Sequence, residues 1–137
     1  MASAAPWLRG WLRTVQAADR VRLAQQQRRH PGLRIHPTAS TAFAGARFQL
    51  ARGARLTIEA GAATERRPGW LNFLIHEGGE IVVGEGAWLR TEVAPVTLVA
   101  YPGGRLELGP GTFINGAHLS AKSEVVLETK AQVGPGS

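Results

Sequence analysis

Residues 104–116 read Gly104-Arg-Leu106-Glu-Leu108-Gly109-Pro-Gly111-Thr-Phe-Ile114-Asn-Gly116, and this stretch decides the fold. Two aliphatic residues alternate with polar ones, a turn with two glycines follows, and an aliphatic returns six residues later. Similar arrangements occur on either side, in residues 54–61, 79–86 and 123–130. Self-similarity of this kind is typical of repeat architectures, so the sequence predicts a solenoid.

Two periods run through the repeats. The first aliphatic residue of each copy recurs after 25, 25 and 19 residues, at Leu56, Ile81, Leu106 and Val125. Within the copies, aliphatic residues pair six apart: Leu50 with Leu56, Ile75 with Ile81, Val83 with Leu89, Leu108 with Ile114, Leu119 with Val125, and Leu127 with Val133. Six residues suit one short strand plus a turn, so three units would form a triangular coil of about eighteen residues around a shared core. The longer steps then predict coils with about seven more residues at a corner.

Paired glycines fall between the units, at Gly84, Gly86, Gly109 and Gly111. A sharp corner needs positive φ or a close backbone approach, and glycine allows both. A phosphate-binding loop is the alternative, but the dinucleotide spacing and a following Gly-Lys-Ser/Thr are absent. We interpret these glycines as corners.

The stretch from Leu106 to Gly116, followed by Val125 to Ser137, resembles the hexapeptide-repeat acyltransferases, especially the sugar O-acetyltransferase branch. The resemblance is specific over residues 98–137, looser over 33–97 and absent from the first thirty residues. It implies an all-β fold, a left-handed parallel β-helix that is usually a homotrimer. It also implies transfer of an acetyl group from acetyl-CoA to a sugar or polysaccharide hydroxyl. The handedness rests on the resemblance, because ordinary parallel crossovers are right-handed.

The family pattern extends beyond this sequence. In such enzymes the general-base histidine usually lies just after the position of Ser137, and later coils build the acetyl-CoA groove. The resemblance therefore implies that these residues correspond to the N-terminal half of an enzyme, with little or no acetyl transfer by themselves. The alternative is a non-catalytic β-helix, a scaffold or self-assembling structural protein, because an open strand edge at 125–137 would invite pairing.

Composition sets the outer limits. The 137 residues are 44% hydrophobic and 19% charged, enough to fold one core. We expect a basic helix in residues 1–31 followed by a β-helix domain in residues 32–137. The absence of cysteine excludes disulfides, thiolate metal sites and a cysteine nucleophile. Because six arginines and a single aspartate fall in residues 1–31, the high isoelectric point does not indicate nucleic-acid binding by the whole chain.

Residues 7–29 predict an amphipathic helix, bounded by Pro6 and by Pro31-Gly32. Its apolar stripe has helical spacing and consists of Trp7, Leu8, Trp11, Leu12 and Val15. We favour packing of this stripe on the first coil or on another subunit, because a β-helix needs its terminal coil covered. The alternative is a peripheral membrane contact, with tryptophan at headgroup depth and arginine facing anionic lipid. With no bilayer-spanning run and a signal-peptide core interrupted by arginine, we expect a cytoplasmic location, with any membrane contact at the inner face.

Two segments interrupt the repeats and predict projecting corner loops, residues 64–72 and 91–96. Such loops commonly carry recognition in a solenoid. The first coil is expected to begin in residues 33–58, with these inward positions: Leu33, Ile35, Phe48 and Leu50.

Four histidines could carry chemistry: His30, His36, His76 and His118. An acyltransferase needs a neutral imidazole within hydrogen-bond reach of the acceptor hydroxyl. His118 is the catalytic candidate because it lies nearest the best repeat, although it does not match the family position. A solvated or structural role is favoured for all four, and no two have metal-ligand spacing, so no metal is expected.

Asn115 is the candidate for substrate binding. Sugar O-acetyltransferases commonly hold the acceptor with an Asn near this point, and the segment 113–115 is similar. The alternative is a corner Asn in the left-handed conformation or one that hydrogen-bonds along the stack. No Gly-x-Ser-x-Gly nucleophile motif is present. Acidic residues beside the turns are expected to be solvated, namely Glu77, Glu80, Glu85, Glu107 and Glu128.

Overall fold

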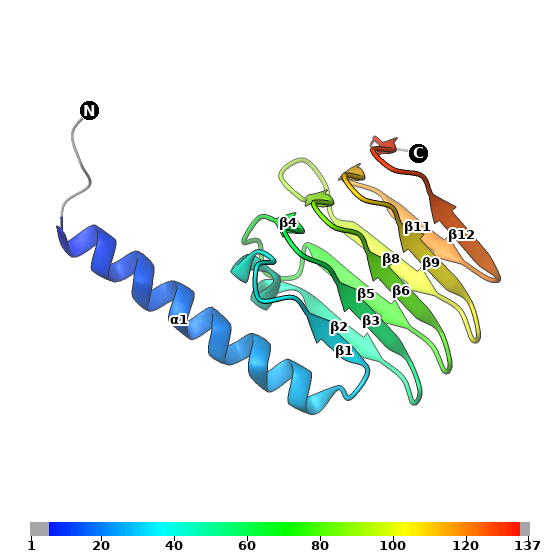
Figure 1. Ribbon diagram of the computed structural model, residues 1–137, viewed down its shortest axis with the longest axis horizontal. Helices are drawn as coiled ribbons and strands as arrows, with labels where there is room; N and C mark the ends of the chain where they lie inside the picture. Colours follow the sequence, from blue (N-terminus) through cyan, green and yellow to red (C-terminus); the bar gives the residue numbers. More distant parts are fainter. Residues whose placement is uncertain (1–5, 135–137) are drawn as a thin grey trace.

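The computed structural model of the protein describes the backbone of residues 6–134 and the side chains of residues 14–134. A long helix, α1 (Pro6–Arg29), precedes a stack of short strands interrupted by one 3-10 helix, η1 (Thr41–Gly45) (Figure 1). The strands are β1 (Leu33–Ile35), β2 (Arg47–Leu50), β3 (Arg55–Ile58), β4 (Ala63–Thr64), β5 (Leu71–Ile75), β6 (Glu80–Val83), β7 (Trp88–Arg90), β8 (Val96–Ala100), β9 (Arg105–Leu108), β10 (Phe113–Asn115), β11 (His118–Ala121), β12 (Glu124–Leu127) and β13 (Gln132–Val133).

The strands form three parallel sheets, one for each side of the coil. Sheet A has the order β1-β3-β6-β9-β12, sheet B the order β11-β8-β5-β2, and sheet C the order β13-β10-β7-β4. Strands that follow one another in the chain lie mostly in different sheets, and each pairs with the strand one coil away (Figure 1). This arrangement confirms the predicted fold, a left-handed parallel β-helix preceded by an α-helix.

The aliphatic column predicted from the repeats runs through sheet A. Its members occupy equivalent register positions and face the core: Leu33, Leu56, Ile81, Leu106 and Val125. Side chains of a strand alternate between the two faces of its sheet, so every second residue points into the core. Residues six apart occupy such inward positions on two successive strands, which belong to neighbouring sheets. The inward positions predicted for the first coil are also confirmed, with Leu33 and Phe48 buried and Ile35 and Leu50 packed against the core.

The extra residues of the long coils lie at two corners, so the prediction that about seven lie at one corner was wrong. Between sheets C and B, the long coils have loops 65–70 and 91–95, where the last coil has only residues 116–117. Between sheets B and A, they have turns such as 101–104, where the last coil has residues 122–123. Strand pairing holds the register on each side, so each corner can change length by itself.

The corner glycines are required for two different reasons. Gly86 and Gly111 have φ of +68° and +70°, which side chains with a Cβ rarely adopt. Gly84 instead lies against the next coil, where a Cβ would come within 2.3 Å of the Leu108 carbonyl oxygen. Gly109 is equivalent, with 2.6 Å to the carbonyl oxygen of Leu127. The interpretation of these glycines as corners is confirmed.

Helix α1 lies at the end of the stack beside β1, and its N-terminal half extends away from the coils (Figure 1). The helix packs on η1 and β1 through Asp19 and Leu23, both buried, with Val15 half-buried. Gln27 Oε1 accepts a hydrogen bond from the backbone N–H of Ile35. The described side chains therefore support packing on the first coil. The rest of the predicted stripe, Trp7, Leu8, Trp11 and Leu12, lies outside the described side chains.

Candidate functional site

Four side chains form a block on the outer face of sheet C. In β7 and β10 the middle residues, Leu89 and Ile114, are fully buried in the core. Because side chains alternate along a strand, the flanking residues face outward. The flanking residues pair in register, Trp88 with Phe113 and Arg90 with Asn115. An aromatic row therefore lies beside a polar row, with adjacent strands about 4.8 Å apart.

Trp88 presents an accessible ring. Its side chain is 41% exposed, and the edge-to-face contact with Phe113 has a centroid distance of 5.1 Å. The guanidinium carbon of Arg90 lies 6.0 Å from the Trp88 ring centroid. The indole Nε1 donates a hydrogen bond to Glu65 Oε2 at 2.5 Å. These contacts fix the orientation of the indole and leave part of it open to solvent.

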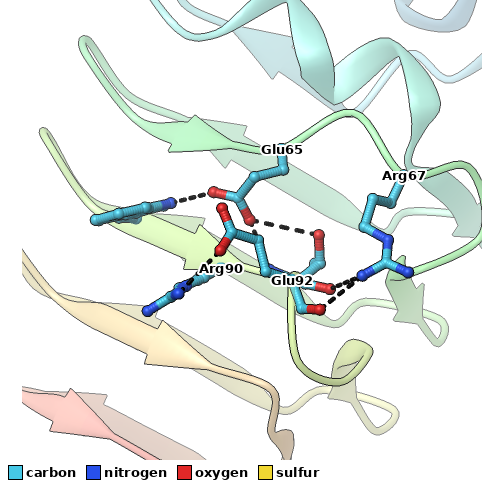
Figure 2. A network of polar contacts seen from close by, with 6 residues as sticks. Glu65, Arg67, Arg90 and Glu92 are labelled. Atoms are coloured by element: carbon cyan, nitrogen blue, oxygen red, sulfur yellow. Dashed lines mark hydrogen bonds and ion pairs between the residues drawn. The ribbon is translucent and has the colours of Figure 1, made fainter.

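Polar contacts between the two corner loops hold this block in place (Figure 2). Besides its bond to the indole, Glu65 accepts one from the backbone N–H of Thr91 at 2.7 Å. Arg67 Nη1 donates to the carbonyl oxygen of Glu92 at 2.7 Å, and the Glu92 carboxylate pairs with Arg90 Nη2 at 2.9 Å. Loops 65–70 and 91–95 thus act as one support for Trp88 and Arg90.

Two buried polar atoms in the block have no hydrogen-bond partner among the described residues: Arg90 Nε and Asn115 Oδ1. One is a donor and the other an acceptor. The position above Asn115 in the next coil is Gly134, which offers no side chain. Buried polar groups usually find partners, because leaving one unpaired costs about 1–3 kcal/mol. A hydroxyl group both donates and accepts, so its hydrogen-bonding capacity matches that of this pair.

The structure places Asn115 in this block, but its backbone is not left-handed. Among the described residues other than glycine, only Lys130 has positive φ, at 61°. The interpretation of Asn115 as a left-handed corner residue is therefore wrong, because Gly116 makes that turn, with φ of +57°. Its Oδ1 also makes no hydrogen bond along the stack.

The four histidines lie apart from this block and from one another. His118 is exposed on the outer face of sheet B, where it pairs with Thr97. His76 stacks on Tyr101 of the next coil, with centroids 5.5 Å apart. His36 is exposed and contacts Thr38, and His30 is half-buried beyond the end of α1. No group of three or more potential metal ligands occurs in the part of the chain that the structure describes.

Two of the glutamates expected to be solvated take part in ion pairs on sheet A. Glu80 lies between Arg55 and Arg105, at 3.5 Å and 3.2 Å, and Glu107 contacts Arg105 at 2.6 Å. The hydrogen bond that Arg105 donates to Glu107 raises the pKa of Arg105, burial opposes this shift, and Glu80 adds to the increase. These ion pairs join side chains of successive coils and of one strand on sheet A. We therefore assign them to the stability of the β-helix and not to a ligand site.

Sequence reasoning did not identify Glu65, Trp88 or Arg90. The same 25-residue step that aligns the aliphatic residues joins Glu65 to Arg90 and Arg90 to Asn115. The 25-residue spacing of these outward polar residues could therefore have identified the block from the sequence.

Comparisons of the chain with protein-family models, curated proteins and solved structures gave no match. No helix in the described residues is long and apolar enough to cross a membrane.

Proposed function

We propose that this chain provides the acceptor side of an acyltransferase that transfers acetyl from acetyl-CoA to a hydroxyl of a sugar or polysaccharide. The observation that carries the proposal is the unpaired donor and acceptor of Arg90 and Asn115. The sequence resemblance to hexapeptide-repeat enzymes supports it independently. A homotrimer in the cytoplasm is part of the same proposal.

The surroundings of this pair suit a sugar. The C–H face of a pyranose packs on an aromatic ring, and Trp88 offers one that is partly exposed. Beside it, Arg90 and Asn115 carry the planar polar groups that would bind hydroxyl groups of the same sugar. In the reaction, the sugar oxygen attacks the thioester carbonyl, its proton passes to a general base, and the thiol of CoA leaves. The described residues would bind and orient the acceptor.

We expect the described coils to bind the acceptor and not to supply the general base or the acetyl-CoA groove, as the resemblance implies. The present chain should then bind an acceptor without acetylating it. Turnover that depends on acetyl-CoA and is abolished by His118→Ala would contradict this expectation and make His118 the base.

The test is titration of the chain with a panel of neutral hexoses and N-acetylhexosamines, followed by the backbone amide resonances. We expect saturable shifts at Arg90 and Asn115 for at least one sugar. Asn115→Ala should weaken binding about fivefold to tenfold, the value of one hydrogen bond. Gln49→Ala is the control, because Gln49 carries an exposed amide on sheet B. If no sugar shifts the amides of the block, the proposal fails.

A non-catalytic assembling β-helix is the second candidate, favoured by the last coil. Strands β11 and β12 each pair with one neighbour among the described strands, and half-buried side chains lie along this coil: Leu119, Val125, Leu127 and Val133. Unpaired strand edges promote association. Light scattering over a concentration series separates the candidates. Open-ended growth without sugar binding would favour a scaffold, whereas a fixed mass with sugar binding would favour an acceptor site.

A further inference from the structure

A cationic pocket lies between the end of α1 and the first corner of the β-helix. Its volume is about 520 Å³, and residues 29–32 and 50–55 line it. Arg29, His30, Arg52 and Arg55 are among its lining residues, and none of the described residues that line it is acidic. The pocket is separate from the block on sheet C, so it calls for its own explanation.

The corner beside this pocket contains the backbone N–H of Gly53, and the equivalent N–H groups of later coils form hydrogen bonds between coils. In those coils the equivalent N–H donates to a carbonyl of the coil below, from Gly78 to Arg52 at 3.4 Å and from Gly103 to Glu77 at 3.0 Å. Gly53 has the same positive φ, +73°, but the turn 30–32, which lies against Ala54, takes the place of a full coil below it. Its N–H has no hydrogen-bond partner in the described residues.

At another corner of the same coil, the equivalent backbone N–H has a hydrogen-bond acceptor. Between sheets A and C, the N–H of Gly86 donates to Ala60 of the coil below. The first-coil equivalent, Gly61, donates to the hydroxyl of Thr38 at 3.1 Å, so a side chain replaces the missing coil. No described side chain accepts from Gly53 in this way, and Gly53 lines the pocket together with Arg29, Arg52 and Arg55.

The positive charge of the pocket is only partly neutralised. The nearest carboxylate to Arg55 is that of Glu80 at 3.5 Å, and Glu80 also pairs with Arg105. Burial, and then the charge of Arg29, lower the pKa of His30. A group with negative charge and several acceptor oxygens would therefore complement the pocket.

We propose that this pocket binds a phosphate group, with Arg29 and Arg52 pairing to its oxygens and the N–H of Gly53 donating to it. Guanidinium groups bind phosphate with two parallel hydrogen bonds, and turns with free N–H groups form anion sites. The phosphate can belong to a soluble phosphorylated molecule or to a phospholipid headgroup. The proposal does not depend on the acceptor site.

The first experiment follows the amides of Gly53 and Gly61 during titration with inorganic phosphate at constant ionic strength. We expect a saturable shift at Gly53 and little change at Gly61, whose donor is already paired. The double variant Arg29→Gln/Arg52→Gln should weaken binding at least about tenfold, since two charge-assisted contacts are lost. The matched control is Arg20→Gln/Arg47→Gln, which removes equal charge outside the pocket. Equal shifts with chloride, or equal weakening in both double variants, would overturn the proposal.

The second experiment identifies the source of the phosphate. Co-sedimentation with vesicles of phosphatidylglycerol is compared with vesicles of phosphatidylcholine alone. Binding to the anionic vesicles that the pocket variant loses and the control variant keeps would support a lipid headgroup, even if free phosphate binds too weakly to detect. A response to neither phosphate nor vesicles would end the proposal.

Discussion

Asp19 of α1 and Arg66 of loop 65–70 form an ion pair that joins the helix to the solenoid. Asp19 Oδ1 accepts a hydrogen bond from Arg66 Nη1 at 2.8 Å, and Arg66 Nη2 contacts the second carboxylate oxygen. The aspartate side chain is 1% exposed and the arginine 40%. Because the residues on either side of Arg66 hold the block on sheet C, one short loop connects α1 with that block.

Arg66→Ala should destabilise the fold by about 2–3 kcal/mol. The substitution leaves the buried Asp19 carboxylate without its cation, which costs 3–5 kcal/mol for a fully buried pair, and the partial exposure of Arg66 lowers that value. Urea unfolding followed by circular dichroism measures the change. Arg20→Ala, an exposed arginine of the same helix, is the control. A loss no greater than the control would mean that the pair does not anchor α1.

The two kinds of corner glycine should respond differently to alanine. Gly84→Ala forces a Cβ against the Leu108 carbonyl oxygen, so we expect a loss of about 3 kcal/mol. Gly86→Ala meets no atom within 4 Å, and its strained φ should cost about 1–2 kcal/mol. The free energies of unfolding of the two variants test this order. Equal losses would show that close coil approach adds nothing beyond backbone strain.

Lys130→Gly should stabilise the protein by about 0.5 kcal/mol. Lys130 occupies the corner position held by Gly111 one coil earlier, with φ of 61°. Glycine removes the steric cost of that conformation, and the greater freedom of glycine in the unfolded chain offsets part of the gain. The urea midpoint measures the effect. Lys122→Gly, at a corner position without positive φ, should instead lower stability.

Stability should fall as pH decreases through the titration of His30. Burial and Arg29 lower the pKa of His30 in the folded chain below its ordinary 6.5, so the unfolded chain binds more protons in that range. The contribution is therefore fully present above pH 6.5 and decreases as pH falls toward the folded pKa. Urea midpoints between about pH 7.5 and about pH 5 follow this slope. His30→Gln should flatten it and His118→Gln should not; an unchanged slope in His30→Gln would refute the assignment.

The repeat in the sequence was sufficient to predict the sheets and their core. One aliphatic period aligned Leu56, Ile81 and Leu106, because a slip of one residue would turn every core side chain outward. The same 25-residue step also relates Trp88 to Phe113 and Arg90 to Asn115. The aliphatic pattern reveals only the inward positions of this step. The outward positions carry no such pattern, so Asn115 was predicted but the rest of the block on sheet C was not.

Other features followed no repeat and could not be predicted. The pairing of Asp19 with Arg66 depends on how α1 packs on the first coil, which no period in the chain encodes. The extra residues of the long coils are divided between two corners, and the hydrogen-bonded register of the strands decides where each corner begins. Sequence spacing gives the number of extra residues but not the corner at which they lie. Likewise, the open donor of Gly53 is a property of the first coil alone.

The coils differ in their number of residues, and this difference shows where the protein can be redesigned or can diverge. Because the last coil is shorter at two corners while its strands stay in register with the coil before it, corner length can change without displacing the core. In loops 65–70 and 91–95, Glu65, Arg66 and Arg67 make the contacts that hold α1 and the block, so changes are best tolerated at other positions, such as the exposed Val93. The surface beside the block on sheet C can therefore change at such positions while the strands beneath keep their register.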